Sequence, residues 1–254
     1  MGGASLRKGR CVVRPKLLLT IRTANRAPKR NYLARTVQNL IAHGVEPDQI
    51  HVFATHPDVS WLPEMPDIGL HVPAYRLTPN ENGVAPIRLL HDITADWIIL
   101  SEDDLEWCDD PLDTMARWLA TYAQPDVLVY RFFAFDRLTP RGKHVASAPL
   151  KEQKGSQVIA LRAADALRFA AWATVHRTDW RPKWAPFQDR PHDGFDKLVG
   201  YWALQDRPLV PFGFVSQPFF VKHVGLESSL HSHGRQMDAA FRAKPYAGQE
   251  AAWP

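Results

Sequence analysis

Residues 16–54 read KLLLTIRTANRAPKRNYLARTVQNLIAHGVEPDQIHVFA, and the hydrophobic pattern of this stretch changes twice. The segment 16–21 is almost continuously apolar, which is typical of a strand that is buried on both faces. After a polar loop the apolar residues adopt a three–four spacing, which predicts a helix that Asn31 caps and that Gly44 ends. A second apolar strand follows at 50–54. Together these elements predict a βαβ unit and therefore a parallel sheet.

The same alternation continues along the chain. It predicts a helix at 86–95, a strand at 97–101, a helix that starts at Pro111 after an Asp110 cap, a strand at 127–135, and helices at 163–175 and 193–202. Asn82 and Gly83 are expected in the turn before the first of these helices. Because no repeat or linker divides the chain, we expect one doubly wound α/β domain at residues 16–234, with a basic tail at 1–15 and a polar tail at 235–254.

Composition narrows the class of protein. The chain has 254 residues, of which 45% are hydrophobic, which is enough for a substantial core and argues against disorder. The formal charge of +4 suits an anionic ligand such as a nucleoside diphosphate, but does not by itself indicate a nucleic-acid binder. Two cysteines, Cys11 and Cys108, are too few for a disulfide scaffold or a cysteine zinc site.

Apolar runs in the sequence are short. None approaches the roughly 20 residues that a membrane-spanning helix needs. The apolar run near the start is also too short for a signal peptide and lacks a small-residue cleavage pattern. We therefore expect a soluble, cytoplasmic protein with no membrane partner.

Three acidic residues, Glu102, Asp103 and Asp104, directly follow the apolar run WIILS. In open α/β sheets, ligands bind beyond the carboxyl ends of the strands, and this is such an end. A hard divalent cation such as Mg²⁺ or Mn²⁺ prefers oxygen ligands and often takes only one or two carboxylates from the protein. The acids therefore indicate a metal site; a solvated loop that caps the next helix is the alternative.

The segment ADWIILSEDDLEW resembles the metal-binding strand end of GT-A-fold glycosyltransferases. Four further stretches resemble the N-acetylglucosaminyltransferase IV family, in the right order: TIRTANRAPKRNYLARTVQNLI, GSQVIALRAADALRF, RPHDGFDKLVGYW and QPFFVKHVGLESSLHSHG. The resemblance spans about residues 16–234. It implies a single GT-A (Rossmann-like) domain, with a mostly parallel central sheet flanked by helices, and a metal-dependent transfer of a hexosyl or N-acetylhexosaminyl group from a nucleotide sugar, with UDP as the expected nucleotide.

The resemblance also implies roles for the acids. Asp104, the last acid of the motif, is expected to bind the metal directly, while Asp103 and Glu102 contact the donor's ribose or metal-bound water. His223, in KHVG, matches a position that can complete the metal site from the far end of the chain. Its alternative is a structural histidine. A zinc cluster of His223 with His231 and His233 is not expected, because neither cysteines nor a tight repeat accompany these histidines.

A hydroxyl acceptor needs a general base, and two aspartates near the start of the last helix are candidates. Alignment with the family places Asp193 on the base position. Asp196, in the first turn, is the second candidate. Both can instead serve the helix itself, because aspartate is favoured at the N-cap and in the first turn. A base opposite the leaving group implies a single displacement with inversion.

Further donor contacts are expected from hydroxyl and guanidinium groups. The candidates at the end of the first strand are Thr20, Arg22, Thr23 and Arg26, whose groups suit phosphates and nucleobase edges. Arg88 lies before the acidic strand and is expected to reach the diphosphate. Ser228 and Ser229 are expected on a loop that closes over the site. Each arginine can instead be a surface charge.

The acceptor stays open between a glycan and a hydroxylated base in nucleic acid. Basic residues mixed with aromatic ones, as in HRTDWRPKWAPF, can line a groove for an anionic polymer such as DNA, or can be a solvated surface. A different class of function is a non-catalytic module that binds a nucleotide sugar or a nucleic acid. Retention of Asp104, Asp193 and His223 together favours the enzyme.

Overall fold

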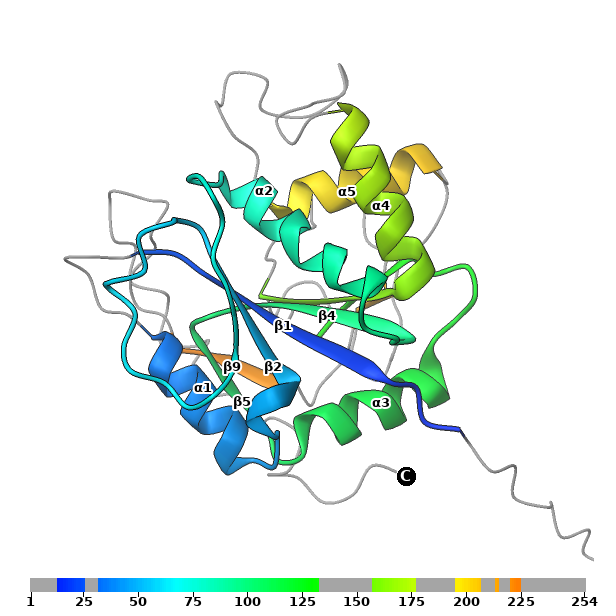
Figure 1. Cartoon of the computed structure of the whole chain (residues 1–254). Helices are drawn as coiled ribbons and strands as arrows, with labels where there is room; N and C mark the ends of the chain where they lie inside the picture. The colour runs from blue at the N-terminus through cyan, green and yellow to red at the C-terminus, as the bar shows by residue number, and fades with distance from the viewer. Residues whose placement is uncertain are drawn as a thin grey trace, which may run out of the picture.

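The structure is a computed structural model that describes residues 13–25, 32–132, 157–176, 195–206, 213–214 and 220–224 (Figure 1). Among these residues the helices are α1 (Leu33–Ala42), α2 (Pro79–Val84), α3 (Pro111–Tyr122), α4 (Ala163–His176) and α5 (Phe195–Asp206), with the 3-10 helices η1 (Pro47–Gln49) and η2 (Ala85–His91). The strands are β1 (Leu17–Thr23), β2 (Ile50–Ala54), β3 (Gly69–His71), β4 (Trp97–Glu102), β5 (Leu105–Trp107), β6 (Val129–Arg131), β7 (Val158–Arg162), β8 (Gly213–Phe214) and β9 (Val221–His223).

Seven of these strands form the central sheet, in the order β3-β2-β1-β4-β7-β6-β8. The strands β3, β2, β1 and β4 are parallel. Strand β7 is antiparallel to both of its neighbours, and β8 is parallel to β6. Strands β5 and β9 form a separate antiparallel pair. The expected α/β domain with a mostly parallel central sheet flanked by helices is confirmed, as is its first βαβ unit.

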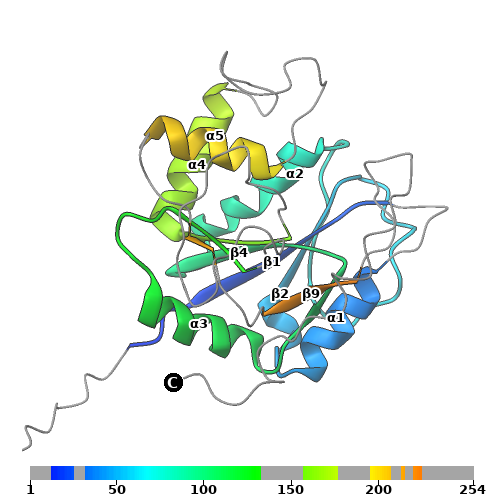
Figure 2. The same cartoon turned by 180° about the vertical axis from the view of Figure 1, so that it is seen from behind.

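Helices cover both faces of the sheet. Helices α1 and α3 lie on one face, and α2, α4 and α5 lie on the other (Figures 1 and 2). Along β4, Ile99 packs with the first group, while Ile98 and Leu100 pack with the second. This alternation follows from the two-residue period of a strand. The continuously apolar sequence of β4 is thus explained by burial on both faces.

Helix α1 begins one residue later than predicted. Tyr32, which is buried, occupies the N-cap position without a side-chain hydrogen bond to the helix. The predicted cap, Asn31, lies outside the described residues. The end of the helix is as predicted: Gly44 adopts a φ of 89°, a conformation that L side chains rarely adopt, and its N–H donates to the carbonyl oxygen of Ile41.

The helix predicted at 86–95 is wrong in its bounds. Residues 79–91 form α2 followed directly by η2, so Asn82 and Gly83 lie inside α2 rather than in a turn. A capping box starts this helix, in which Glu81 N donates to Thr78 Oγ1 at 3.2 Å and Thr78 N donates to Glu81 Oε2 at 2.7 Å. The sequence TPNE carries this capping-box signal, with proline at the first helical position.

The later helices agree better with the prediction. Pro111 is the first residue of α3, as predicted, although its N-cap Asp110 has a left-handed φ of 43° and no side-chain capping bond. Helix α4 matches the predicted 163–175 within one residue, and α5 begins at Phe195. Strand β6 is shorter than the predicted 127–135, the last residues of which lie outside the described part of the chain. Strands β5 and β9 were not predicted.

Candidate functional site

Four side chains cross the carboxyl ends of the parallel strands. His71 of β3 is paired with Phe53 of β2, Phe53 with Arg22 of β1, and Arg22 with Glu102 of β4. Paired residues of neighbouring strands point to the same face of a sheet, and Phe53 belongs to the core beneath α4 and α5. These four residues, which we call the cross-strand row, therefore lie on the α2–α4–α5 face, at the edge where open α/β sheets bind ligands.

Arg22 is the buried cation of the cross-strand row. Its side chain is 8% exposed, and its Nη2 lies 3.6 Å from Glu102 Oε1. Its Nε donates to the carbonyl oxygen of Ser101 at 3.4 Å, and its Cζ lies 4.6 Å from the centre of the Phe195 ring. Burial lowers the pKa of Arg22, and four nearby acids oppose this shift: Glu102, Asp103, Asp196 and Asp104. Because a buried charge must be paired, the acids and Arg22 stabilise one another.

Two threonines fix the bend between β4 and β5. Thr23 Oγ1 donates to Asp103 Oδ2 at 2.5 Å, and the Asp103 side chain is almost fully buried. Thr36 Oγ1 lies 2.8 Å from the carbonyl oxygens of both Asp103 and Leu105, and it accepts a hydrogen bond from Leu105 N. The acidic turn is therefore held from β1 and from α1.

Asp104 and His223 are brought together by the β5–β9 pair. Leu105 pairs with His223 in this ladder, and the backbone N–H of Val224 donates to the carbonyl oxygen of Asp104 at 2.9 Å. Asp104 is buried, with 4% of its surface exposed. Asp104, directly before β5, and His223, the last residue of β9, thus have neighbouring backbones although they are far apart in the sequence. The side chain of His223 lies outside the described part of the structure.

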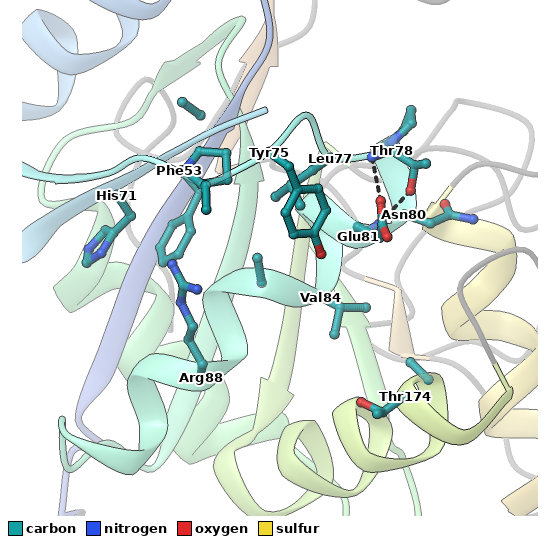
Figure 3. Close-up of a pocket in the computed structure, with 16 residues that line it drawn as sticks. Phe53, His71, Tyr75, Leu77, Thr78, Asn80, Glu81, Val84, Arg88 and Thr174 are labelled. Atoms are coloured by element: carbon teal, nitrogen blue, oxygen red, sulfur yellow. Dashed lines mark hydrogen bonds between the residues drawn. The ribbon is translucent and has the colours of Figure 1, made fainter. Parts of the chain in front are cut away.

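A pocket of about 750 Å³ opens at the aromatic end of the cross-strand row (Figure 3). Phe53 and His71 of the row line it, together with Tyr75, Val84 and Arg88. The Phe53 and His71 rings are stacked, with centres 4.3 Å apart and an interplanar angle of 10°. The Cζ atom of Arg88 lies 5.6 Å from the centre of the Phe53 ring. One wall of the pocket therefore contains two stacked rings, Phe53 and His71, with the guanidinium of Arg88 over Phe53.

His71 also contacts a second histidine. The Nδ1 atom of His51 lies 3.3 Å from Nε2 of His71, a hydrogen-bond distance. Burial lowers the pKa of both imidazoles; for His71 the neighbouring His51 and Arg88 add to the effect, whereas Asp48 opposes it for His51. Such a bond needs one nitrogen without a proton, so the pair is stable in its neutral form.

The predicted donor contacts divide into separate groups. Arg22 and Thr23 lie beside the acids, as described above. Thr20 is fully buried, and its hydroxyl donates to the carbonyl oxygen of Ile99 at 3.0 Å, inside the sheet. Arg88 lies in the pocket wall rather than beside the acids. The remaining predicted site residues lie outside the described part of the chain: Arg26, Asp193, Ser228 and Ser229.

The three acidic residues offer carboxylate oxygens, which are the ligand atoms that a hard divalent cation prefers. Glu102 pairs with Arg22, and Asp103 accepts a hydrogen bond from Thr23. The buried Asp104 is the candidate ligand because the resemblance implies it. Mg²⁺ and Mn²⁺ commonly take one or two carboxylates and complete their shell with water and phosphate oxygens. In the described part of the chain, no group of three or more His, Cys, Asp or Glu side chains forms a metal-binding cluster.

Sequence reasoning missed several residues of this site. Phe53 and His71 read as ordinary strand residues, and their role follows only from the register of β1, β2 and β3. Arg131 was also missed: it is fully buried on β6, and its Nη2 donates to the carbonyl oxygen of Asp196 at 3.4 Å. An arginine in the middle of an apolar run such as VLVYRFFAF is the signal that indicates a buried, paired cation.

Comparisons with known proteins give likenesses of structure alone. No known family profile and no curated protein sequence matches the chain. Among solved structures, the chain is similar to a mannosyltransferase, PcManGT from Pyrobaculum calidifontis in complex with GDP-Man and Mn²⁺, with a TM-score of 0.48, 14% identity, and coverage of 81% of this chain and 55% of that one. It is also similar to TarS from S. aureus (TM-score 0.47, 12% identity, 85% and 38% covered).

A third similar structure is a cytidylyltransferase from Leptospira borgpetersenii serovar Hardjo-bovis, with a TM-score of 0.41, 12% identity, and coverage of 81% of this chain and 77% of that one. The chain therefore spans about half of the length of the mannosyltransferase chain and less than half of TarS. In the part of the chain that the structure describes, no helix is long and apolar enough to cross a membrane.

Proposed function

We propose that the chain is a metal-dependent, inverting glycosyltransferase that moves a sugar from a nucleoside diphosphate sugar to a hydroxyl acceptor. The observation that carries this proposal is the cross-strand row. It joins a pocket walled by planar groups to a cluster of buried acids, along a single edge of the sheet. A nucleotide sugar has the matching order of parts, with a planar base at one end and a charged diphosphate and sugar at the other.

The pocket is the candidate site for the donor's nucleoside. Its volume of about 750 Å³ lies in the range of small-molecule sites, about 300–1,000 Å³. Phe53, His71 and Tyr75 offer apolar faces to a base, and Arg88 and Glu81 offer polar groups to its edges or to the ribose. Figure 3 shows the Arg88 side chain reaching toward the Phe53 ring. UDP is the nucleotide that the resemblance supports.

The acidic turn is the candidate site for the diphosphate and its cation. Asp104 is proposed as the direct ligand of Mn²⁺ or Mg²⁺, with His223 as a second ligand, because β5 and β9 place their backbones side by side. When bound, the cation would stabilise the negative charge on the departing diphosphate. Arg22 holds Glu102 in place, and Thr23 holds Asp103, so that both remain ordered beside the donor's ribose.

The acceptor hydroxyl is proposed to lose its proton to an aspartate at the start of α5. That helix starts against Arg22, because the Phe195 ring packs on its guanidinium. A base here lies close to the acidic turn, as attack on the anomeric carbon requires. A glycan and a hydroxylated base in nucleic acid both remain candidate acceptors, since both present a hydroxyl group.

The proposal is tested by binding and turnover of nucleotide sugars. A thermal-shift screen of UDP-, GDP- and CDP-sugars with and without Mn²⁺ should raise the melting temperature of the wild type for at least one donor only when the metal is present. The same donor should be slowly hydrolysed. Asp104→Asn should remove the metal-dependent shift and lower hydrolysis at least about 100-fold.

The matched control is Glu106→Gln, two residues further on, where the carboxylate pairs with the exposed Arg35. This variant should keep both the shift and the hydrolysis. Donor binding without hydrolysis, and without a metal requirement, would contradict the enzymatic proposal and favour a non-catalytic binding module. Salt-sensitive binding of DNA by the wild type would favour the nucleic-acid acceptor.

A further inference from the structure

Gln157 lies beside Glu102, at the end of the cross-strand row that is farther from the pocket. The last pair of the β4–β7 ladder joins Ser101 to Val158. One position further along, the N–H of Glu102 donates to the carbonyl oxygen of Gln157 at 2.9 Å. Because β7 is antiparallel to β4, the residue that precedes β7 lies at the same edge of the sheet as the carboxyl ends of β1 and β4.

The side chain of Gln157 lies on the α2–α4–α5 face of the sheet. Residues that face each other on neighbouring strands point to the same side, and Glu102 lies on this face. The two-residue period of β7 gives the same answer. Ile159 packs in the core beneath α4 and α5, whereas Val158 packs on the opposite face. Gln157 therefore continues the cross-strand row onto a fifth strand.

The Gln157 side chain carries a buried hydrogen-bond acceptor. The residue is 8% exposed, and its Oε1 atom has no hydrogen-bond partner in the part of the chain that the structure describes. Buried polar atoms are nearly always hydrogen-bonded, because an unsatisfied one costs free energy. An amide oxygen accepts and cannot donate, so the group that suits it is a donor. A hydroxyl group fits this requirement, and the unprotonated oxygens of a diphosphate do not.

The position of Gln157 in the sheet indicates which part of a donor it meets. Three strand spacings, about 14 Å, separate Phe53 on β2 from Gln157. A group bound at Gln157 is therefore not the base, for which the pocket beside Phe53 is the candidate site. The candidate site of the diphosphate is the acidic turn after β4. Because β7 is the next strand in the same direction, the part of the donor that reaches it is the sugar.

We propose that Gln157 is a specificity-determining residue, whose amide oxygen accepts a hydrogen bond from a hydroxyl group of the transferred sugar. This inference rests on the proposed function and deepens it. The site then selects its sugar through a neutral amide that lies beside the ion pair of Arg22 and Glu102. A sugar without this hydroxyl leaves the buried oxygen without a donor, and a site of this kind rejects such a ligand.

Titration calorimetry separates the sugar from the rest of the donor. The probes are UDP-glucose, its monodeoxy analogues and UDP itself, each with Mn²⁺. The wild type should bind UDP-glucose at least about 10-fold more tightly than one of the monodeoxy analogues. Gln157→Met keeps the length of the side chain and removes the acceptor. This variant should bind UDP-glucose and that analogue equally, and it should bind UDP as the wild type does.

Thermal unfolding is the readout that needs no ligand. Since Gln157 Oε1 has no partner among the described residues, Gln157→Met should leave the melting temperature unchanged or raise it by up to about 4 °C. Asn39→Leu is the matched control, because Asn39 Oδ1 accepts a hydrogen bond from Trp107 N at 2.5 Å. This control should lower the melting temperature by at least about 2 °C. A comparable fall in Gln157→Met would show that the protein itself satisfies the amide, and would overturn the inference.

Gln38→Met is the control for the titrations, because Gln38 is exposed on α1, which covers the other face of the sheet. It should discriminate among the sugars as the wild type does. Undiminished discrimination in Gln157→Met, or a wild type that binds every monodeoxy analogue as tightly as UDP-glucose, would overturn the inference and leave the proposed function in place.

Two further outcomes separate this inference from the proposed function. Weaker binding of UDP by Gln157→Met would show that Gln157 serves the diphosphate or its cation, which would overturn the assignment to the sugar. A wild type that binds no nucleotide sugar would contradict the proposed function itself, and the assignment to a sugar hydroxyl would fall with it. The melting temperatures would still show whether the amide of Gln157 is satisfied within the protein.

Discussion

The two ends of the cross-strand row use the same edge of the sheet in opposite ways. At one end, the buried Arg22 pairs with the partly exposed Glu102, and threonines fix the buried Asp103 beside them. At the other end, Phe53 and His71 stack, and a pocket opens over them. The ionic end is closed and depends on charges that compensate one another. The aromatic end is open and offers surface to a ligand.

Stability and ligand binding should therefore depend on different ends of the cross-strand row. Removing one member of a buried ionic group leaves its partners uncompensated, so mutations there should lower stability first. When a pocket side chain is removed, water can solvate the groups that remain. Mutations in the pocket should therefore weaken ligand binding more than they lower stability. The following variants test this contrast.

Arg22→Met should have the largest effect. It leaves buried carboxylates without their cation, and we expect the free energy of unfolding to fall by about 3–5 kcal/mol, as measured by urea denaturation. Arg35→Met is the control, because the Arg35–Glu106 pair is largely exposed and should contribute less than about 1 kcal/mol. An equal loss of unfolding free energy in the two variants would show that Arg22 contributes no more to stability than an exposed ion pair does.

Gly83→Ala should come next, and its sign is informative. In an exposed helix, alanine is more stable than glycine by about 1 kcal/mol. Here the new Cβ would meet the Phe195 ring at 2.1 Å, so we expect a loss of about 1–3 kcal/mol instead. Adding Phe195→Leu should recover part of the loss, because it removes the clashing ring edge. Stabilisation by Gly83→Ala alone would show that α2 and α5 do not touch as described.

Arg88→Gln should change binding and leave stability nearly unaltered. Loss of the cation over Phe53 is expected to weaken nucleotide binding by about 1 kcal/mol, or roughly fivefold, in isothermal titration. Arg117→Gln, on α3 at the opposite face of the sheet, should bind as the wild type does. If Arg88→Gln lowered the melting temperature and left nucleotide binding unchanged, the aromatic end would serve stability rather than binding, contrary to this prediction.

The smallest effect is expected from pH at the aromatic end. The pKa of both His51 and His71 is lowered in the folded state from the ordinary histidine value of 6.5. Below that pH the unfolded chain therefore binds more protons than the folded chain does. The contribution of these histidines to stability should therefore be complete above pH 6.5 and be lost as the pH drops through their lowered pKa values in the folded state. His71→Asn should flatten this slope, measured by denaturation between pH 5 and pH 8. His91→Gln, at an exposed position, should not.

The sequence anticipated features that depend on neighbouring residues. The βαβ unit at 16–54 follows from changes in hydrophobic period, and Pro111 marks a helix start because its fixed backbone angle suits the first turn. The placement of Glu102, Asp103 and Asp104 at a strand end follows from the apolar run before them. The bounds of α2 were missed although the capping box at 78–81 was present, because Asn82 and Gly83 were expected in a turn before a helix at 86–95.

Other features depend on residues that are distant in the chain, and the tertiary structure alone decided them. These are the reversed direction of β7, the pairing of β5 with β9, and the contact of Arg131 with the start of α5. The physical reason is one of range. Hydrophobic period, capping and backbone preference act within a few residues and are written in the local sequence. The register that aligns His71, Phe53, Arg22 and Glu102 is set by hydrogen bonds between four strands and by packing from both faces, which no local pattern encodes.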